Sequence, residues 1–164
     1  MILEIKKGRE NPVLRKKSKE VKSITKRMVK FIKEMEKAME AEKGVGLAAP
    51  QVGENIRLIL VTLDNKKVIP MVNPVIISCS KDAEYNEEGC LSLPGEWGQV
   101  ERYKEVTVIY RDDKNRKCAL KLDGFNARIV QHEIDHLDGI LFTDYLDSKG
   151  DGFGEMGEEG VGRL

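Results

Sequence analysis

The feature that most restricts how this chain can fold is a series of short β-rich runs joined by tight connections. The runs are flanked by Gly, Asn, Asp or Pro and cover residues 56–63, 68–72, 75–78, 106–110 and 118–122. Residues 64–66 and 112–116 indicate tight connections between neighbouring strands, because they are short and rich in Asp and Asn. Strands joined in this way run antiparallel, so we expect a largely antiparallel sheet.

Helical periodicity marks one segment on each side of this β-rich region. In residues 23–42, apolar side chains recur at intervals of three and four residues, and Gly44 follows as a terminator. In residues 123–138, a second apolar face ends at Gly139. The pattern therefore predicts an α+β fold, with mostly antiparallel strands packed around the second helix and one N-terminal amphipathic helix.

The composition indicates one domain followed by a tail. A length of 164 residues suits a single domain, and 40% hydrophobic residues are enough to bury a core. We expect the domain to span residues 1–146, whereas residues 147–164 contain six glycines and are expected to pack weakly or to be mobile. No apolar run approaches the roughly 18 residues of a membrane span. The N-terminus also lacks the pattern of a secretory leader, so we expect an intracellular protein.

The charge is balanced overall but uneven along the chain. The 28 basic and 28 acidic residues cancel, whereas residues 1–37 hold 13 Lys or Arg against 5 Glu. Such a basic end favours a polyanionic partner. The aromatic side chains that single-strand binding uses do not alternate with these cations, so the plainer interpretation is the solvated face of a helix. Nucleic acid is therefore not expected to be the main ligand.

The chain has only two histidines, and both lie in the pentapeptide HEIDH of the second predicted helix. His132 and His136 are one helical turn apart, so their side chains project from the same face. Two imidazoles at this spacing can bind one metal ion, while Glu133 between them lies beside a metal-bound water. A surface helix with two incidental histidines is the alternative. We therefore expect the central helix to be a metal-binding helix.

A catalytic metal ion usually takes a third protein ligand, for which the sequence offers two candidates. Cys90 lies between a glycine and the turn-forming pair Pro94-Gly95, where a thiolate on a bent strand would be accessible. Cys79 and Cys118 lie in predicted strands and are interpreted as small core residues, and three cysteines argue against a disulfide framework. The alternative is a zinc endopeptidase with Glu155 as third ligand, although the glycines around Glu155 disfavour a rigid helix.

The segment 44–51, GVGLAAPQ, is rich in small residues and connects the first helix to the first long strand. It formally matches a dinucleotide-binding pattern, but that pattern requires strand, glycine turn and helix in this order, whereas the order here is helix, turn and strand. The small residues would instead let another chain segment lie close to this backbone. Gln51 at its end either donates an amide near the site or faces solvent.

Three segments together resemble the signature motifs of the peptide deformylases. They are GVGLAAPQ at 44–51, EGCLS at 88–92 and QHEIDHL at 131–137, and they occur in the order and spacing of that family. The segment NPVLR at 11–15 is also similar to the N-terminal segment of the family. The resemblance covers residues 1 to about 146. It implies a bacterial cytoplasmic hydrolase that removes the formyl group from the N-terminal formyl-methionine of new proteins and releases formate.

The resemblance also implies a role for each site residue. Cys90, His132 and His136 would bind one divalent metal ion, usually Fe²⁺ in the cell, with Zn²⁺, Ni²⁺ or Co²⁺ as substitutes. Glu133 would act as the acid and base.

Further residues are implied around the substrate. Gln51 and the backbone N–H of Leu91 would stabilise the oxyanion, while Val45 and Gly46 would bind the peptide, the latter through its backbone. The expected partner is the N-formyl-methionyl nascent polypeptide. Many family members end in a long basic helix that contacts the ribosome. The acidic, glycine-rich tail of this chain does not resemble such a helix. A ribosome contact would therefore involve the basic N-terminal part.

Overall fold

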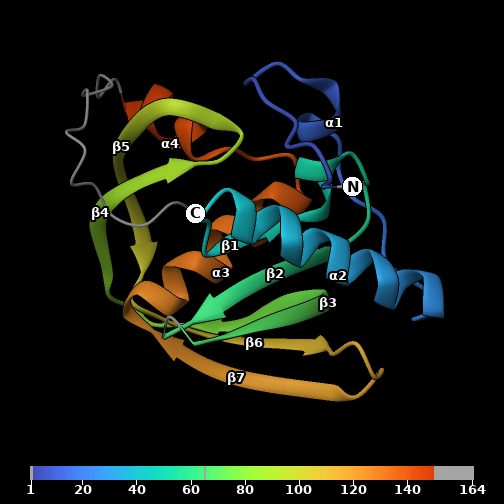
Figure 1. The fold of residues 1–164 in the computed structure, drawn as a ribbon. Helices are drawn as coiled ribbons and strands as arrows, with labels where there is room; N and C mark the ends of the chain where they lie inside the picture. Colours follow the sequence, from blue (N-terminus) through green and yellow to red (C-terminus); the bar gives the residue numbers. More distant parts are fainter. Residues whose placement is uncertain (1, 65, 150–164) are drawn as a thin grey trace.

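The computed structural model describes residues 2–64 and 66–149, which form two systems of strands around one central helix (Figure 1). A five-stranded antiparallel sheet has the order β1-β2-β3-β6-β7, and β4 and β5 pair only with each other in a long ribbon. The strands are β1 (Gly46–Ala48), β2 (Leu58–Leu63), β3 (Lys67–Cys79), β4 (Ala83–Cys90), β5 (Leu93–Tyr103), β6 (Glu105–Arg111) and β7 (Lys117–Asp123). The helices are α1 (Pro12–Arg15), α2 (Lys26–Ala41), the 3₁₀ turn η1 (Ala49–Val52), α3 (Gly124–Leu137) and α4 (Phe142–Lys149).

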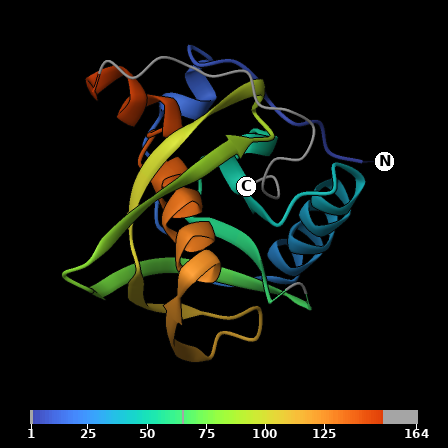
Figure 2. The ribbon, with the colours of Figure 1, turned by 90° about the vertical axis from the view of Figure 1, so that its left-hand side faces the viewer.

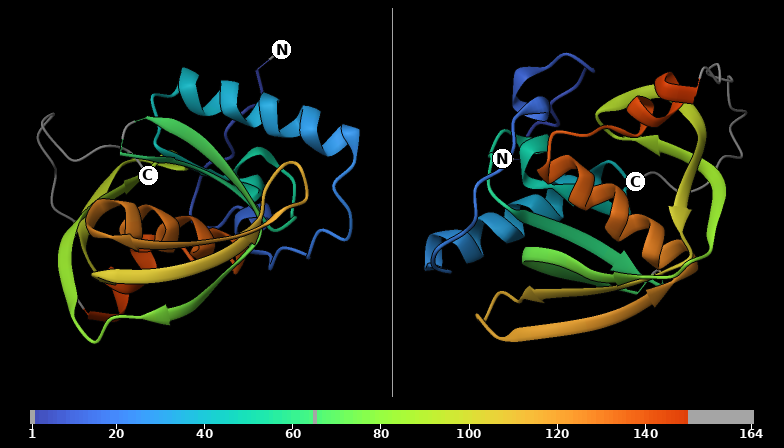
Figure 3. Two further views of the ribbon diagram at one scale, coloured as in Figure 1. Left: turned by 90° about the horizontal axis from the view of Figure 1, so that it is seen from below. Right: turned by 180° about the vertical axis from the view of Figure 1, so that it is seen from behind.

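The first four residues of the strand β2 are buried on both faces, which explains why the run Leu58–Val61 is entirely apolar. Leu58 and Leu60 contact the cluster under the amphipathic helix α2, whereas Ile59 and Val61 contact the cluster around α3. Successive side chains of a strand point to opposite faces, so each helix covers alternate residues of the same strand. Figure 3 shows α2 and α3 on the two sides of the sheet.

The ribbon of β4 and β5 covers the other side of α3, and α4 packs on the ribbon (Figure 2). Gly98 in β5 lets α4 pack closely on the ribbon, because a Cβ atom at this position would lie 2.2 Å from a methyl carbon of Leu146. Nine of the 14 residues of α3 are buried, including its arginine, its glutamine and both of its histidines. Since buried polar groups need partners, the chemistry of the fold is expected along this helix.

The predicted α+β class, with antiparallel strands around a central helix and an N-terminal amphipathic helix, is confirmed. The two runs at 68–72 and 75–78 form one strand, β3, with a register shift between Val72 and Val75 where Asn73 has φ 51°. The ribbon was not predicted, because residues 83–103 are rich in charge and glycine. The short strand β1 and the helix α4 were not predicted either.

Two local expectations about the cysteines are wrong. Cys79 is exposed, since it ends β3 beyond the covered part of the sheet, whereas Cys118 is half-buried and packs against the core cluster as expected. The chain reverses at Leu91 and Ser92, because Cys90 pairs with Leu93 across the end of the ribbon, and the predicted turn at 94–95 lies inside β5. Cys90 is consequently buried, with 5% of its surface exposed.

The predicted boundary at residue 146 falls within α4, which continues to Lys149. The rest of the predicted tail, residues 150–164, lies outside the described residues. No helix in the described part of the chain is long and apolar enough to cross a membrane.

Candidate metal centre and active site

His132 and His136 on α3 meet Cys90 at the end of β4, as the sequence predicted. One ligand atom from each of the three side chains lies within 4.8 Å of the other two, and all three residues are buried. Cys90 Sγ is 3.4 Å from His136 Nε2. The donor atoms of a four-coordinate ion, each bound at about 2.0–2.3 Å, lie at similar distances from one another. The three donors form one cluster of the kind that binds a single metal ion.

The buried polar atoms around this cluster fit a bound cation. His132 Nε2 has no hydrogen-bond partner among the described residues, and neither carboxylate oxygen of Glu133 has one. A buried polar group without a partner costs about 1–3 kcal/mol. A divalent ion and a water molecule would satisfy these atoms, so the residues present fit a metal site. Glu155, the alternative third ligand, lies outside the described residues.

Glu133 packs against the backbone of Gly46 in β1, which identifies the close approach expected at the small residues of 44–51. A Cβ atom on Gly46 would lie 2.5 Å from Glu133 Oε2, so any side chain at this position would have to displace the Glu133 carboxylate. Glu133 is fully buried, and burial raises its pKa to about 7. A carboxyl group with this pKa can both accept and donate a proton near neutral pH.

Gln51 is buried in η1 and directs its amide group toward the metal-ligand cluster. Its side-chain Oε1 accepts a hydrogen bond from the backbone N–H of Ala48 at 2.9 Å, which fixes the orientation of the amide. Its Nε2 donates to Ser92 Oγ at 3.0 Å and lies 3.6 Å from Cys90 Sγ. The alternative of a solvent-facing glutamine is therefore wrong. Leu91, whose N–H is the other expected oxyanion donor, is in the turn directly after Cys90.

Sequence reasoning missed Glu88, which connects the ligand cluster to two arginines. Glu88 is fully buried and accepts two hydrogen bonds from Arg102 at 2.9 Å, one from Arg128 at 2.6 Å and one from His132 Nδ1 at 2.8 Å. Burial alone would raise the pKa of Glu88, but the charge and hydrogen bonds of Arg102 hold it far below its usual 4.5. Since the Nδ1–H of His132 donates to the ionised Glu88, the Nε2 of this ring can keep its lone pair for a metal ion. The position of Glu88, two residues before Cys90, was the available signal.

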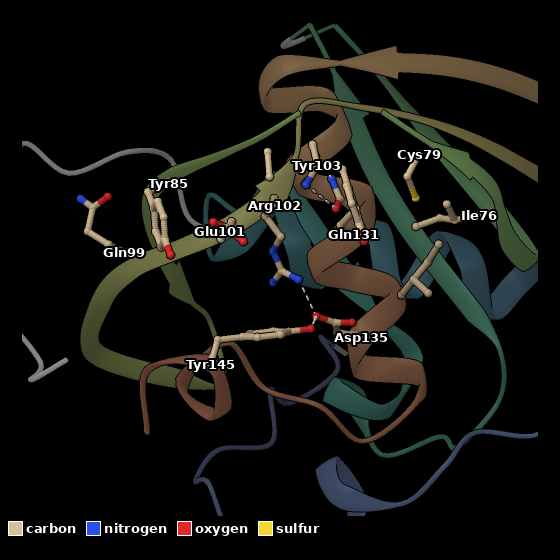
Figure 4. Close-up of a pocket in the computed structure, with 12 residues that line it drawn as sticks. Ile76, Cys79, Tyr85, Gln99, Glu101, Arg102, Tyr103, Gln131, Asp135 and Tyr145 are labelled. Atoms are coloured by element: carbon tan, nitrogen blue, oxygen red, sulfur yellow. Dashed lines mark hydrogen bonds and ion pairs between the residues drawn. The ribbon is translucent and has the colours of Figure 1, made fainter. Parts of the chain in front are cut away.

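Arg102 extends this network to a cavity of about 530 Å³ between α3 and the ribbon (Figure 4). Its guanidinium bonds to Asp135, and Tyr145 of α4 donates to the same carboxylate at 2.8 Å. The guanidinium also lies 5.0 Å from the centre of the Tyr145 ring. The helix α4, absent from the sequence prediction, thus closes one side of the charged network.

Two imidazoles from one helical turn, a thiolate from a neighbouring strand and an unpartnered buried carboxyl group define a mononuclear metal-dependent hydrolase. The sequence profile of the polypeptide deformylases matches residues 2–151. The chain belongs to the polypeptide deformylase family and is an enzyme of that family.

Individual relatives agree with this assignment. The chain is 46% identical over 134 residues to a peptide deformylase of Desulforudis audaxviator, covering 82% of this chain and 87% of that protein. It is 42% identical over 138 residues to the peptide deformylase of Treponema pallidum strain Nichols, covering 84% of this chain and 85% of that protein. The solved peptide deformylase of Thermotoga maritima has a TM-score of 0.85 at 36% identity over 88% of this chain and 97% of that one. The solved peptide deformylase of Legionella pneumophila has a TM-score of 0.86 at 37% identity, over 92% of this chain and 89% of that one.

Proposed function

We propose that this enzyme hydrolyses the formamide bond of N-formyl-methionyl polypeptides, releasing formate, with one divalent ion bound to Cys90, His132 and His136. The observation that carries the proposal is the convergence of these three donors beside the unpartnered carboxyl group of Glu133. Two imidazoles and one thiolate suit Fe²⁺, Zn²⁺, Ni²⁺ and Co²⁺, of which Fe²⁺ is proposed for the cell. The bound ion would polarise the formyl carbonyl and lower the pKa of a coordinated water.

Glu133 moves the proton in this proposal. Its carboxylate accepts the proton of the attacking water, and the resulting acid donates it to the amine that leaves. The raised pKa near 7 suits both steps, because neither protonation state is strongly favoured at neutral pH. Its contact with Gly46 keeps the carboxyl group at one position while this exchange takes place.

Gln51 and Leu91 stabilise the charge that develops on the formyl oxygen. The Gln51 amide is held by Ala48 and Ser92 before any substrate binds, so its N–H groups need no reorganisation during the reaction. The Leu91 N–H is a backbone group in the turn after Cys90, and its position is fixed by the ribbon. A preorganised donor of this kind is worth about 10²–10³ in turnover.

The edge of β1 that has no partner strand among the described residues is the proposed binding site of the peptide. Thr62 N donates to Val45 O, so Val45 and Thr62 form a hydrogen-bonded pair of the antiparallel ladder. Such pairs alternate, and Gly46 therefore turns its N–H and C=O away from β2, toward the free edge. An extended nascent chain can pair with these groups as an additional strand, next to Val45.

A formyl-methionyl peptide incubated with the metal-loaded enzyme tests this function. We expect stoichiometric formate and a peptide with a free N-terminus by mass spectrometry. Cleavage of an internal bond would instead support the endopeptidase alternative. A protein that binds metal and releases neither product would contradict both enzymatic functions.

The basic face of α2 is the proposed site of a ribosome contact. Lys26, Lys30, Lys33 and Lys37 are exposed and recur every three or four residues, opposite the buried side of the helix. None of the four is in ion-pair distance of a carboxylate among the described residues. A row of unpaired lysines about one helical turn apart can follow an RNA phosphate backbone without reading its sequence.

Cosedimentation with ribosomes tests this contact. Replacing Lys26, Lys30 and Lys33 together by Glu should abolish cosedimentation at low salt and leave turnover of a short formyl-methionyl peptide unchanged. The control is Lys117→Glu, an exposed lysine on β7 at the other end of the sheet. Equal binding of the triple variant would contradict the proposed contact.

A further inference from the structure

We propose that Arg128 is a positioning residue for the metal site, acting through Glu88 on both elements that supply metal ligands. The inference rests on the proposed metal site. Arg128 is 2% exposed, and its side-chain hydrogen bonds go to Glu88, Val100 and Glu84 rather than to Cys90, His132 or His136. Its effect must therefore pass through the groups that it holds.

Glu88 on β4 lies opposite two residues of α3, Arg128 and His132. Arg128 and His132 are one turn apart on α3 and share a face of this helix, and Glu88 and Cys90 of β4 both face α3, because Glu88 contacts His132 and Cys90 contacts His136. One carboxylate joins the two elements, because Glu88 Oε2 accepts from Arg128 at 2.6 Å while Oε1 is 2.8 Å from His132 Nδ1. The face of α3 that carries the ligands is thereby tied to β4 at two points.

Arg128 also binds the backbone of both strands of the ribbon. Its Nη1 donates to Val100 O in β5 at 2.9 Å, and its Nη2 donates to Glu84 O in β4 at 2.9 Å. A guanidinium offers several donors in one rigid plane, so a single side chain can hold a carboxylate and two carbonyls at once. Arg128 consequently fixes the distance between the ribbon, which carries Cys90, and the helix, which carries His132.

Arg102 does not duplicate this function. It comes from β5 and holds both oxygens of Glu88, but its remaining contacts are with Asp135 and the Tyr145 ring (Figure 4). Without Arg128, Arg102 would keep Glu88 ionised and buried, whereas the hydrogen bonds that join α3 to Glu88 and to the ribbon backbone through Arg128 would be lost. The expected defect is thus a misplaced His132 in a folded protein.

The test compares Arg128→Met and Arg128→Lys with the wild type as metal-loaded proteins. Loss of an outer partner of a metal-binding histidine typically lowers metal affinity or activity about 10- to 100-fold. We expect Arg128→Met to release Zn²⁺ to a chelator at least about tenfold faster. The Co²⁺ form should show shifted ligand-field absorption bands, because these bands report the geometry of the donors. Lysine keeps the charge but not the fork of donors, so Arg128→Lys should be intermediate in both readouts.

The control is Arg116→Met, which removes an exposed arginine that pairs with Asp112 on the β6–β7 hairpin. It should leave metal release and the Co²⁺ spectrum unchanged. If Arg128→Met does not fold, the comparison of Arg128→Lys with the wild type decides the matter. Wild-type release rates and spectra in the folded Arg128 variants, with only a lower unfolding midpoint, would overturn the positioning function. A wild-type protein that binds no Co²⁺ through Cys90 would instead overturn the proposed metal site.

Discussion

Replacing Gly46 by Ala uses one methyl group to test the proposed catalytic role of the Glu133 carboxyl group. The new Cβ atom would lie 2.5 Å from Glu133 Oε2 and 2.9 Å from its Cδ and Cγ. Ordinary contact begins near 3.4 Å, so the nearest oxygen must move away by roughly 0.9 Å. Gly46 is not among the residues with positive φ, and its backbone can accept alanine without strain. The perturbation therefore acts on Glu133 alone.

A displacement of about 1 Å in a reacting group can lower turnover about 10²-fold, or by about 2.7 kcal/mol in activation free energy. We expect kcat of Gly46→Ala on a formyl-methionyl peptide to fall by this amount, with one metal ion retained. The measurement is steady-state kinetics together with metal analysis. Gly44→Ala is the matched control, because its new Cβ atom would come closest to the flexible end of the Leu91 side chain, at 2.8 Å, and would reach Gly46 O only at an ordinary contact distance of 3.6 Å. The control should lose far less activity.

Three results would refute this reasoning. A raised KM with unchanged kcat would mean that the methyl group obstructs the peptide at the β1 edge rather than Glu133. Loss of the metal ion would mean that the contact supports the ligand cluster. A further loss from Gly46→Ala in a Glu133→Gln background would also contradict it, since the methyl group should then have little catalysis left to disturb.

Four further outcomes are expected. Glu133→Gln should keep the metal ion and lose about 10²–10⁴-fold in turnover, because an amide accepts no proton from water; near wild-type turnover would exclude Glu133 as the base. Cys90→Ala should lose the metal ion and activity together, whereas Cys79→Ala, which removes an exposed thiol, should retain both in a metal analysis. The pKa of Glu88 is lowered on folding, so its contribution to stability is complete above the unfolded pKa of about 4.5 and declines as the pH falls below that value. Urea unfolding midpoints measured at successively lower pH should therefore decline less in Glu88→Gln than in the wild type. Truncation after Lys149 should leave peptide turnover intact, because every residue with a proposed role precedes it, and a loss of metal would revive the alternative ligand in the tail.

Much of the site could be predicted because its chemistry is local in sequence. His132, Glu133 and His136 are set by helical spacing alone, and a helix places them on one side whatever the rest of the fold does. The segments around Gln51 and Cys90 were identified by their resemblance to a family and by their turn residues. The antiparallel sheet followed from short connections between β-rich runs, which the structure confirms for β2, β3, β6 and β7.

Other features depended on contacts between distant segments and had no local pattern. Glu88, Arg102 and Arg128 look like ordinary surface charges in the sequence, and they are buried because the ribbon folds over α3 and brings the three together. The exposure of Cys79 and the burial of Cys90 were predicted the wrong way round for the same reason. Cys79 and Cys90 both end a strand, and their burial depends on which other segments pack over that end.

The sequence by itself therefore predicted which groups would bind a metal ion and move the proton, because these predictions depend on residue type and on spacing within one element. The tertiary structure alone decided how those groups are held. The distance from Cys90 to α3, the orientation of His132 and the burial that raises the pKa of Glu133 all arise where the ribbon, the sheet and the helix meet. Such long-range electrostatic and packing interactions are properties of the folded chain, in which charges far apart in sequence share one buried, low-dielectric environment.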